Sequence, residues 1–298
     1  PSSSLPSDLK IAPENTQGCL RRMAASLPLR SISLEIFFMA AKETYFSLLC
    51  AMRDTIYIAS DMHFGSPDAI SSRERERRFV AWLDDIAPRV QELWLLGDLF
   101  DFWFEYKRAV PKGHIRFLGK LAELADAGVP IHIFVGNHDL WFGDYLEKEL
   151  GATIYRKPQM REWYGKHFYL AHGDGLGPGD HGYKLMKKVF TNPFCKWAFA
   201  RLHPNFGIWL ASSFSQKSLK ANPKKATALI PEKEFLYQHV RDLIPQHPEL
   251  GYFVFGHRHH FHQTEIVPGK RLIYLGDWMQ YDSFLEISAE GVELKKWG

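Results

Sequence analysis

Residues 55–63 of this 298-residue chain read TIYIASDMH, an apolar run followed by two side chains that commonly bind metals. The run from Thr55 to Ala59 has the length and the β-branched, aromatic composition of a buried strand. Asp61 and His63 follow it, separated by one residue. On an extended segment, residues two apart point to the same side. The stretch therefore predicts a strand that carries a pair of polar ligands at its carboxyl end.

The same pattern recurs along the chain, where short apolar runs at 93–96, 131–135, 167–171, 252–255 and 272–275 are predicted as strands. Helices are predicted at 73–90 and 114–127, between the first three strands. A strand–helix–strand spacing of roughly 35–40 residues fits consecutive βαβ units. The fold class is therefore α/β, and later strands at 283–287 and 292–295 suggest a second sheet packed on the first. The polar motifs that follow the strands are Asp61-Met62-His63, Gly97-Asp98-Leu99-Phe100-Asp101, Gly136-Asn137-His138-Asp139, His172-Gly173-Asp174 and Gly256-His257-Arg258-His259.

These five motifs are expected to meet, because ligands of an open α/β sheet bind outside the carboxyl ends of its strands. Carboxylate, imidazole and amide oxygen together suit Mn²⁺, Fe²⁺ or Zn²⁺. An aspartate such as Asp98 can bridge two ions, and two ions about 3.5–4 Å apart can clamp a phosphoryl group. Each motif alone often occurs by chance as a polar turn, but five in order at strand ends do not. The candidate ligands are Asp61, His63, Asp98, Asn137, His172, His257 and His259.

The ordered motifs D-x-H, G-D-x-x-D, G-N-H-D, H-G-D and G-H-x-H resemble those of the calcineurin-like metallophosphoesterase superfamily. The resemblance implies a four-layer α/β/β/α sandwich and two divalent ions, with Mn²⁺ expected and Fe²⁺ or Zn²⁺ as alternatives. It also implies that His138 stabilises the transition state or protonates the leaving oxygen, oriented by Asp139. The implied ligand sets are Asp61, His63, Asp98 and His259 for one ion, and Asp98, Asn137, His172 and His257 for the other.

A closer resemblance is to the bacterial UDP-2,3-diacylglucosamine pyrophosphatase family of lipid A synthesis. It rests on Gly97-Asp98-Leu99-Phe100 with Trp103 beyond, and on Asp180 and Tyr183 at the family's spacing after His172-Gly173-Asp174. It implies hydrolysis of UDP-2,3-diacylglucosamine to UMP and 2,3-diacylglucosamine 1-phosphate. A helical insertion at 179–225 would form a lid over the acyl chains of this nucleotide-sugar lipid. The implied substrate contacts are Asp180, Tyr183, Lys217 and Lys220.

The insertion is rich in aromatic, aliphatic and basic residues, a composition that suits acyl chains and an anionic membrane surface. The other interpretation is that its aromatic residues pack on the parent domain and its lysines are solvated. The first interpretation predicts a cytoplasmic enzyme that is peripheral on the cytoplasmic face of the inner membrane.

Two other functions stay open on the sequence alone. Well-studied pyrophosphatases of the resembling family often carry Arg where this chain has His138, so another phosphomonoester, phosphodiester or nucleic acid is an alternative substrate. The net charge of +3 and the lack of an evident base-stacking groove argue against nucleic acid. A non-catalytic scaffold is the third hypothesis. It is disfavoured because all seven ligand positions are filled.

The N-terminal segment and the cysteine content give further expectations about domain boundaries and compartment. Residues 1–51 begin with a Pro/Ser-rich stretch and are interpreted as an extension outside the domain of residues 52–298, with a helical appendage at 31–51 as the alternative. The apolar stretch at 27–52 contains four charged residues, too many for a membrane span. Three cysteines without paired spacing favour a reducing compartment.

For some residues near the motifs, the sequence indicates a role less directly. Asp277 is interpreted as structural, and Asp101 and Asp174 as residues that either orient ligands or cap loops. The charged run at 73–78 is expected to be an exposed first turn of a helix.

Overall fold

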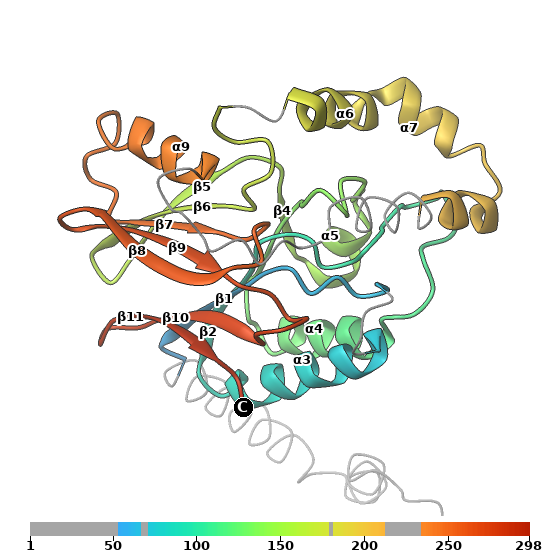
Figure 1. Cartoon of the computed structure of the whole chain (residues 1–298). Coiled ribbons are helices and arrows are strands. Elements are labelled where there is room, and N and C mark those ends of the chain that lie inside the picture. The colour runs from blue at the N-terminus through green and yellow to red at the C-terminus, as the bar shows by residue number, and fades with distance from the viewer. Residues whose placement is uncertain (1–52, 67–70, 179–180, 212–233) are drawn as a thin grey trace, which may run out of the picture. The chain divides into compact units, whose positions relative to one another are not determined.

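Two β-sheets form the centre of residues 53–298 (Figure 1). The computed structural model describes residues 53–66, 71–178, 181–211 and 234–298, so the predicted extension 1–51 and the contacts Asp180, Lys217 and Lys220 lie outside the described residues. The first sheet has the strand order β11-β10-β1-β2-β3-β4, and the second has the order β5-β6-β7-β9-β8. The strands are β1 (Thr55–Ala59), β2 (Val90–Leu95), β3 (Ile131–Phe134), β4 (Thr153–Tyr155), β5 (Gln159–Trp163), β6 (Lys166–Ala171), β7 (Tyr252–Phe255), β8 (Phe261–Val267), β9 (Lys270–Leu275), β10 (Ser283–Ile287) and β11 (Val292–Lys296).

The central strands of both sheets run parallel, which places their carboxyl ends at shared edges. In the first sheet β1 pairs with β2, β2 with β3 and β3 with β4 in parallel. In the second sheet β6 pairs with β7, and β7 with β9, in parallel. Antiparallel strands extend both sheets, with β10 on β1 and β5 on β6. The predicted α/β class and second sheet are therefore confirmed.

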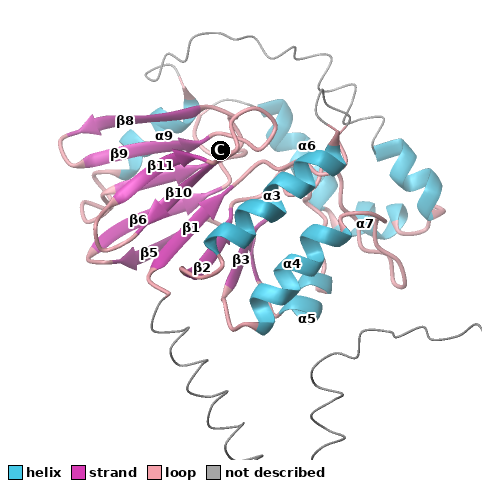
Figure 2. Ribbon diagram, turned by 90° about the horizontal axis from the view of Figure 1, so that it is seen from below, coloured by secondary structure: helices cyan, strands magenta, loops and turns pink. Residues whose placement is uncertain are grey.

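Helices cover the outer face of each sheet. In the first sheet, α3 (Ser72–Ile86), α4 (Ile115–Asp126) and α5 (Tyr145–Leu150) lie on one face (Figure 2). In the second sheet, α9 (Phe235–Leu243) packs on the outer face through Leu236 and Val240. The result is the predicted four-layer α/β/β/α sandwich.

Three separate hydrophobic cores correspond to the three interfaces between these layers. Tyr57 and Ala59 of β1 join the core beneath the helices of the first sheet, whereas Ile56 and Ile58 join the core between the sheets. The third core lies between the second sheet and α9. β1 is buried on both faces, which is why its sequence is a continuous apolar run rather than an alternating one.

Helix α3 begins at a side-chain cap but does not expose its charged first turns as predicted. Ser71 Oγ accepts a hydrogen bond from the backbone N–H of Glu74. However, Arg75 and Glu76 are buried. Glu76 Oε1 accepts hydrogen bonds from the first N–H groups of α4, at Arg116 and Phe117, so it caps the neighbouring helix. The expectation of an exposed charged run is therefore confirmed at Arg73, Glu74 and Arg77, and wrong at Arg75 and Glu76.

Two further helices, α6 (His181–Thr191) and α7 (Pro193–Phe199), follow the second-sheet strand β6. Residues 204–211 are also helical, so the described part of the predicted insertion is helical throughout most of its length. An aromatic cluster joins these helices to the body of the domain. Trp141 Nε1 donates to the carbonyl oxygen of Phe190, and the rings of Trp141 and Phe199 lie 4.6 Å apart. None of the helices in the described ranges is both long and apolar enough to cross a bilayer.

Candidate metal centre

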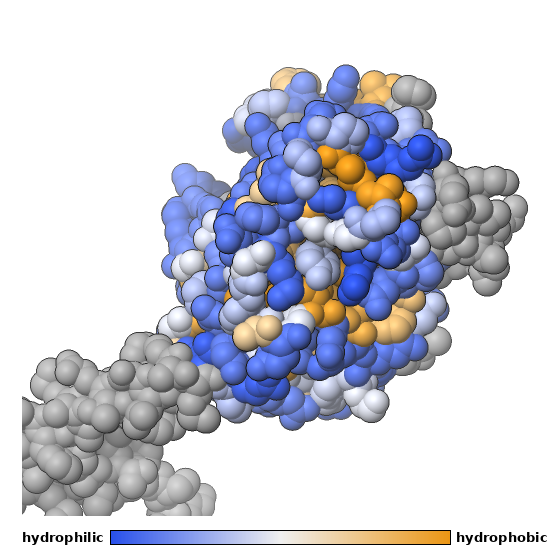
Figure 3. Space-filling view, turned by 90° about the vertical axis from the view of Figure 1, so that its left-hand side faces the viewer, coloured by the Kyte–Doolittle hydropathy of each residue, from blue (hydrophilic) through white to orange (hydrophobic). Residues whose placement is uncertain are grey.

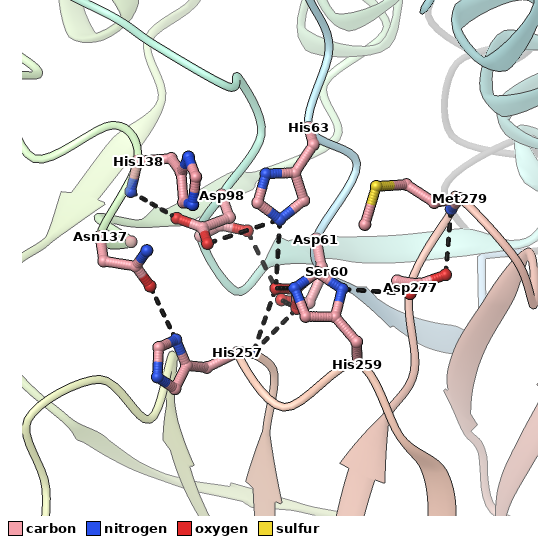
Figure 4. A network of polar contacts seen from close by, with 12 residues as sticks. Ser60, Asp61, His63, Asp98, Asn137, His138, His257, His259, Asp277 and Met279 are labelled. Carbon is pink, nitrogen blue, oxygen red and sulfur yellow. Dashed lines mark hydrogen bonds and ion pairs between the residues drawn. The ribbon is translucent and has the colours of Figure 1, made fainter. Parts of the chain in front are cut away.

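The seven predicted ligand side chains come together at the carboxyl ends of β1, β2, β3, β6 and β7. They originate from residues as far apart in the sequence as 61 and 259, yet they form one network of polar contacts. Figure 4 shows this network, with all of them except His172 labelled. Ligand atoms of Asp61, His63 and His259 lie within 4.8 Å of one another, and so do those of Asp98, His172 and His257. The structure therefore brings the predicted residues into two adjacent groups.

The first group surrounds the Asp61 carboxylate. His63 Nε2 lies 3.7 Å from Asp61 Oδ1, and His259 Nε2 lies 3.6 Å from the same oxygen. The other oxygen, Asp61 Oδ2, accepts hydrogen bonds from Ser60 Oγ at 2.6 Å and from the backbone N–H of His257 at 2.9 Å. The His257 N–H also donates to Oδ1, at 3.2 Å, so the oxygen that faces the two imidazole nitrogens shares this donor with Oδ2.

Asp98 lies between the two groups. Its Oδ2 is 3.6 Å from His63 Nε2 on one side and 3.3 Å from His172 Nε2 on the other. Its Oδ1 accepts a hydrogen bond from the backbone N–H of His138 at 2.8 Å. This central position is the one that a bridging carboxylate requires.

The second group is completed by Asn137. Asn137 Oδ1 lies 3.1 Å from His172 Nε2 and 2.7 Å from His257 Nδ1. The other ring nitrogen of His172, Nδ1, lies 2.6 Å from the carbonyl oxygen of Leu96 and donates to it. In its neutral form, a histidine that donates from Nδ1 to a carbonyl has a free lone pair on Nε2, and this is the form that binds a metal.

The charges of this cluster are strongly coupled. Burial opposes the charged form of His172, but the Asp98 carboxylate outweighs it and raises the pKa of His172 to about 10. Burial likewise disfavours ionised Asp98, yet the charges of His172 and His138 hold its pKa well below the usual value. For His257, burial and then the His172 charge lower the pKa to about 4. In the metal-free site the protonated form of His172 is therefore favoured.

Metal binding to this site should release a proton and tighten as the pH rises. An ion that binds His172 must displace the proton held by its raised pKa, so the apparent Kd should fall up to about tenfold per pH unit between about pH 6 and pH 9. His257 is already neutral there and releases none. Titration calorimetry with Mn²⁺ in two buffers of different ionisation enthalpy counts the protons. An affinity independent of pH would contradict this prediction.

The donor set also fits a pair of divalent cations on geometric grounds. Atoms that each lie about 2.1 Å from one ion are roughly 3–3.5 Å from each other, close to the separations found between these carboxylate oxygens and imidazole nitrogens. His63 Nε2 is buried and has no hydrogen-bond partner among the described residues. A buried nitrogen without a partner is costly. An ion between His63, Asp61 and Asp98 would satisfy it.

Backbone conformation at the site is unusual. Asp61, His63, Asp98, His257 and His259 all have positive φ, between 46° and 62°. Non-glycine residues rarely adopt this left-handed conformation, and such strain is concentrated at functional sites. The five residues are held in it by the packed strand ends around them, which directs their side chains into one small volume.

Gly136 is required because its backbone touches Asp98. A Cβ at position 136 would lie 2.2 Å from Asp98 Oδ1 and 2.4 Å from the Asp98 backbone nitrogen. Neither atom can move without displacing the carboxylate at the centre of the site. The glycine of the G-N-H-D motif is therefore a consequence of close approach between two loops.

Gly136→Ala should destabilise the fold by about 1–3 kcal/mol and weaken metal binding, because the added methyl group displaces Asp98. Urea denaturation and Mn²⁺ titration measure the two effects. Gly119→Ala is the matched control: Gly119 lies within α4, and its added Cβ meets nothing within 4 Å. That variant should be neutral or more stable by about 0.5–1 kcal/mol. Equal stability of the two variants would exclude the steric explanation.

The Nδ1 atom of His138 faces Asp101, whereas the prediction named Asp139 as the residue that orients the ring. His138 Nδ1 lies 3.1 Å from the Asp101 carbonyl oxygen and 3.4 Å from Asp101 Oδ1. The Asp139 carboxylate instead accepts from the backbone N–H groups of Leu99 and Gly136, at 2.8 and 2.7 Å. Asp139 therefore joins the loops that carry Asp98 and Asn137. Its predicted role as the orienting partner of His138 stays a prediction.

The His138 ring has the charge of a potential acid. Burial favours the neutral ring, but the carboxylates of Asp98 and Asp101 outweigh it and raise the pKa of His138 to about 9. The ring packs edge-on against His63, with ring centroids 4.6 Å apart. Although it lies close enough to His63 and Asp98 to join a metal cluster, its contact with Asp101 directs Nδ1 away from them.

Two residues that support the site were not recognised in the sequence. Asp277, interpreted as structural, has an oxygen 3.1 Å from His259 Nδ1, and its other oxygen accepts from the N–H groups of Met279 and Gln280. Buried Arg75 donates to the carbonyl oxygen of His63 at 2.6 Å. A signal for Asp277 was present, because Gly276-Asp277 follows β9 just as Gly97-Asp98 follows β2. No sequence pattern distinguished Arg75 from its charged neighbours.

Asp277→Asn should weaken metal binding about 10–100-fold, because the carboxylate fixes His259 with Nε2 towards Asp61 and makes the ring more basic. Equilibrium dialysis against Mn²⁺ measures the change. Asp126→Asn, at the exposed end of α4, controls for the loss of one charge. Unchanged affinity in Asp277→Asn would show that His259 needs no such partner.

Of the predicted substrate contacts, Tyr183 is the one that falls among the described residues. Its hydroxyl donates to Asp174 Oδ2 at 2.5 Å, and Lys187 Nζ donates to the same oxygen at 2.5 Å. Asp174, for which the sequence left two roles open, therefore joins the loop after β6 to helix α6. This contact places α6 beside His172, two residues before Asp174.

Comparison with known proteins agrees with this geometry. A family model described as calcineurin-like phosphoesterase matches residues 55–261. A protein of Porphyromonas gingivalis named UDP-2,3-diacylglucosamine hydrolase is 40% identical over 245 residues, which cover 78% of this chain and 94% of the relative. Proteins of the same name from Edwardsiella ictaluri and Hahella chejuensis are each 29% identical and cover 80% of this chain, and 90% and 96% of the relatives.

Proposed function

The chain belongs to the calcineurin-like phosphoesterase family, and from this premise we propose that it hydrolyses the pyrophosphate bond of UDP-2,3-diacylglucosamine. The products would be UMP and 2,3-diacylglucosamine 1-phosphate. Membership of the family makes the protein a hydrolase, and the clustered ligands indicate a dinuclear site for divalent metals. The observation that carries the substrate is the 40% identity to a relative of that name, over 94% of the relative's length.

The proposed ligands divide into two sets that share Asp98, as the contacts described above support. One set is Asp61, His63, Asp98 and His259, and the other is Asp98, Asn137, His172 and His257. Mn²⁺ is the proposed metal, because the site mixes hard carboxylate and amide oxygens with imidazoles; Fe²⁺ and Zn²⁺ are the alternatives. When bound, the pair of ions would supply Lewis acidity that activates water and neutralises phosphoryl charge.

The protein's own side chains would orient the reacting phosphate and donate a hydrogen bond or a proton to it. We propose that His138 donates a hydrogen bond or a proton to an oxygen of the reacting phosphate, with the Asp101 carboxylate beside its ring favouring the protonated form. Asp101 would hold the ring in position through Nδ1. Asp139 would act indirectly, by holding together the two loops that carry Asp98 and Asn137.

The insertion supports contact with a lipid. Large apolar side chains are exposed on α6, α7 and residues 204–211, among them Leu185, Phe194, Trp197 and Trp209, with exposed fractions of 65%, 70%, 54% and 61%. The upper edge of the space-filling view, at the height of α6 and α7 in Figure 1, shows hydrophobic side chains (Figure 3). Aromatic and aliphatic groups interspersed with lysines are typical of surfaces that bind membranes. We therefore propose that residues 179–225 form a lid for acyl chains and attach the enzyme to the cytoplasmic face of the inner membrane.

The substrate is tested by offering the purified protein with Mn²⁺ three compounds side by side: UDP-2,3-diacylglucosamine, bis-p-nitrophenyl phosphate and single-stranded DNA. Release of UMP from the first at a much higher kcat/KM supports the proposal. Turnover of the generic ester or of DNA alone would replace it with another phosphoesterase activity. Absence of turnover of all three by the Mn²⁺-loaded protein would argue for a non-catalytic role.

Membrane contact is tested by sedimentation with phosphatidylglycerol vesicles. Phe194→Ser combined with Trp197→Ser should reduce the bound fraction, because both side chains are exposed on α7. Met160→Ser, which removes an exposed apolar side chain from β5, serves as the control. Equal sedimentation of all three proteins would contradict the proposed surface.

A further inference from the structure

A cavity of about 570 Å³ opens beside the metal centre, and no role has so far been assigned to it. It is bounded by the end of β3, the turn between β4 and β5, the loop after β6 and helix α6. His172, one of the proposed ligands, forms part of its wall. The volume lies within the range of about 300–1,000 Å³ that is usual for small-molecule sites. A ligand in this cavity would therefore lie next to the reaction centre.

The wall of the cavity carries an excess of positive charge. Asp174 is the one carboxylate among its lining residues, and this group already accepts from Tyr183 and Lys187. Lys184 Nζ donates to the carbonyl oxygen of Gly177. The remaining cationic charge has no counter-charge in the wall, which favours an anionic ligand. The cations of the wall are Arg156, Lys157, Lys184, Lys187 and Lys188.

Helix α6 separates this basic surface from an apolar one. Lys184, Lys187, Lys188 and Thr191 are spaced i, i+3, i+4 and i+7, so they share the face that lines the cavity. Met186, Val189 and Phe190 lie on the opposite face of the helix. There the Phe190 ring lies 5.6 Å from the ring of Trp141, within the aromatic cluster. One side of α6 therefore suits a charged group, and the other suits hydrocarbon.

We infer that the cavity holds the nucleotide half of the substrate, with its phosphate on the basic face of α6 and the turn at Arg156 and Lys157. This inference rests on the proposed substrate, which has a charged nucleotide at one end and two acyl chains at the other. The nucleotide matches the cationic wall, and the acyl chains match the apolar face. Because His172 borders the cavity, a nucleotide bound there would lie next to the metal centre, where the pyrophosphate bond would be cleaved.

The inference is tested by binding of UMP to the Mn²⁺-loaded full-length protein, measured directly by calorimetry. Lys157→Ala combined with Lys188→Ala should raise the Kd of UMP about tenfold or more, because two charge-assisted contacts are lost. The Kd of 2,3-diacylglucosamine 1-phosphate should change less than about twofold. Lys166→Ala, at the start of β6 and outside the cavity wall, should leave both affinities as they are.

Three outcomes would overturn the inference: wild-type protein that binds no UMP at millimolar concentration, an unchanged Kd of UMP in the double variant, or weakened binding of the lipid phosphate alone. The last result would assign the cavity to the sugar phosphate. Metal content of each variant, measured by atomic emission, separates these effects from damage to the metal centre. If the wild type binds UMP through these lysines but does not cleave UDP-2,3-diacylglucosamine, the substrate proposal fails and the cavity assignment stands.

Discussion

Asp98→Asn should lower kcat/KM for UDP-2,3-diacylglucosamine by about 10³-fold or more and remove most of the bound metal. Asp98 Oδ2 lies 3.6 and 3.3 Å from the nitrogens of His63 and His172, so it is placed to serve both ions. An amide keeps the shape of the carboxylate but loses its charge and one acceptor. Both proposed ligand sets should therefore weaken together, and activity should fall with metal content.

The loss must be separated from unfolding, because Asp98 is buried and also accepts the backbone N–H of His138. Circular dichroism and urea denaturation report whether the variant folds. In the metal-free state Asp98→Asn should also lower the pKa of His172, because the carboxylate is what raises it. Asp126→Asn is the matched surface control. Two metal ions bound as tightly as in the wild type would rule out Asp98 as the shared ligand.

That the seven side chains come together could be predicted because the sequence encodes their positions locally. Each ligand follows a strand whose apolar run is evident, and parallel strands bring their carboxyl ends to a common edge. Neither step requires knowledge of side-chain packing. The same logic applied to Gly276-Asp277 after β9 would have identified the partner of His259.

Short or half-exposed elements were missed because they carry little of that signal. β4 has three residues and no fully buried position, and β8 alternates between exposed and half-buried residues at a sheet edge. α9 was missed because its apolar residues Leu236 and Val240 give only a short helical repeat before the chain turns. Buried Arg75 and Glu76 could not be predicted, since charged residues are rarely buried and their partners are backbone groups of other segments.

The roles of neighbouring carboxylates were also beyond the reach of the sequence. Asp139 is adjacent to His138 in the chain, and this proximity suggested that the two are partners. In the fold the Asp139 carboxylate turns inward to two backbone N–H groups. Asp101, which lies 37 residues before His138 in the chain, faces the His138 ring. Which carboxylate meets a given imidazole depends on how the loops after β2 and β3 cross, which spacing alone does not determine.

This geometry leads to a specific expectation for His138. His138→Gln should lower kcat about 10²–10³-fold while metal content stays near the wild-type value, because the side chain is proposed to act on substrate oxygen and not on the ions. A group that donates a proton is active only while protonated. The wild-type rate should therefore fall as the pH rises through the pKa of His138 in the metal-loaded enzyme, a pKa that the adjacent Asp101 carboxylate raises.

The pH profile distinguishes this role from a merely structural one. His138→Gln should lose the alkaline limb of log kcat against pH, and Asp101→Asn should move that limb to lower pH, because one of the charges that raise the pKa of His138 is removed. His247→Gln, which alters a histidine beside Glu249 in the turn after α9, should change neither rate nor profile. If His138→Gln kept the wild-type alkaline limb, the titrating group would be another one. His138 would then contribute only packing against His63.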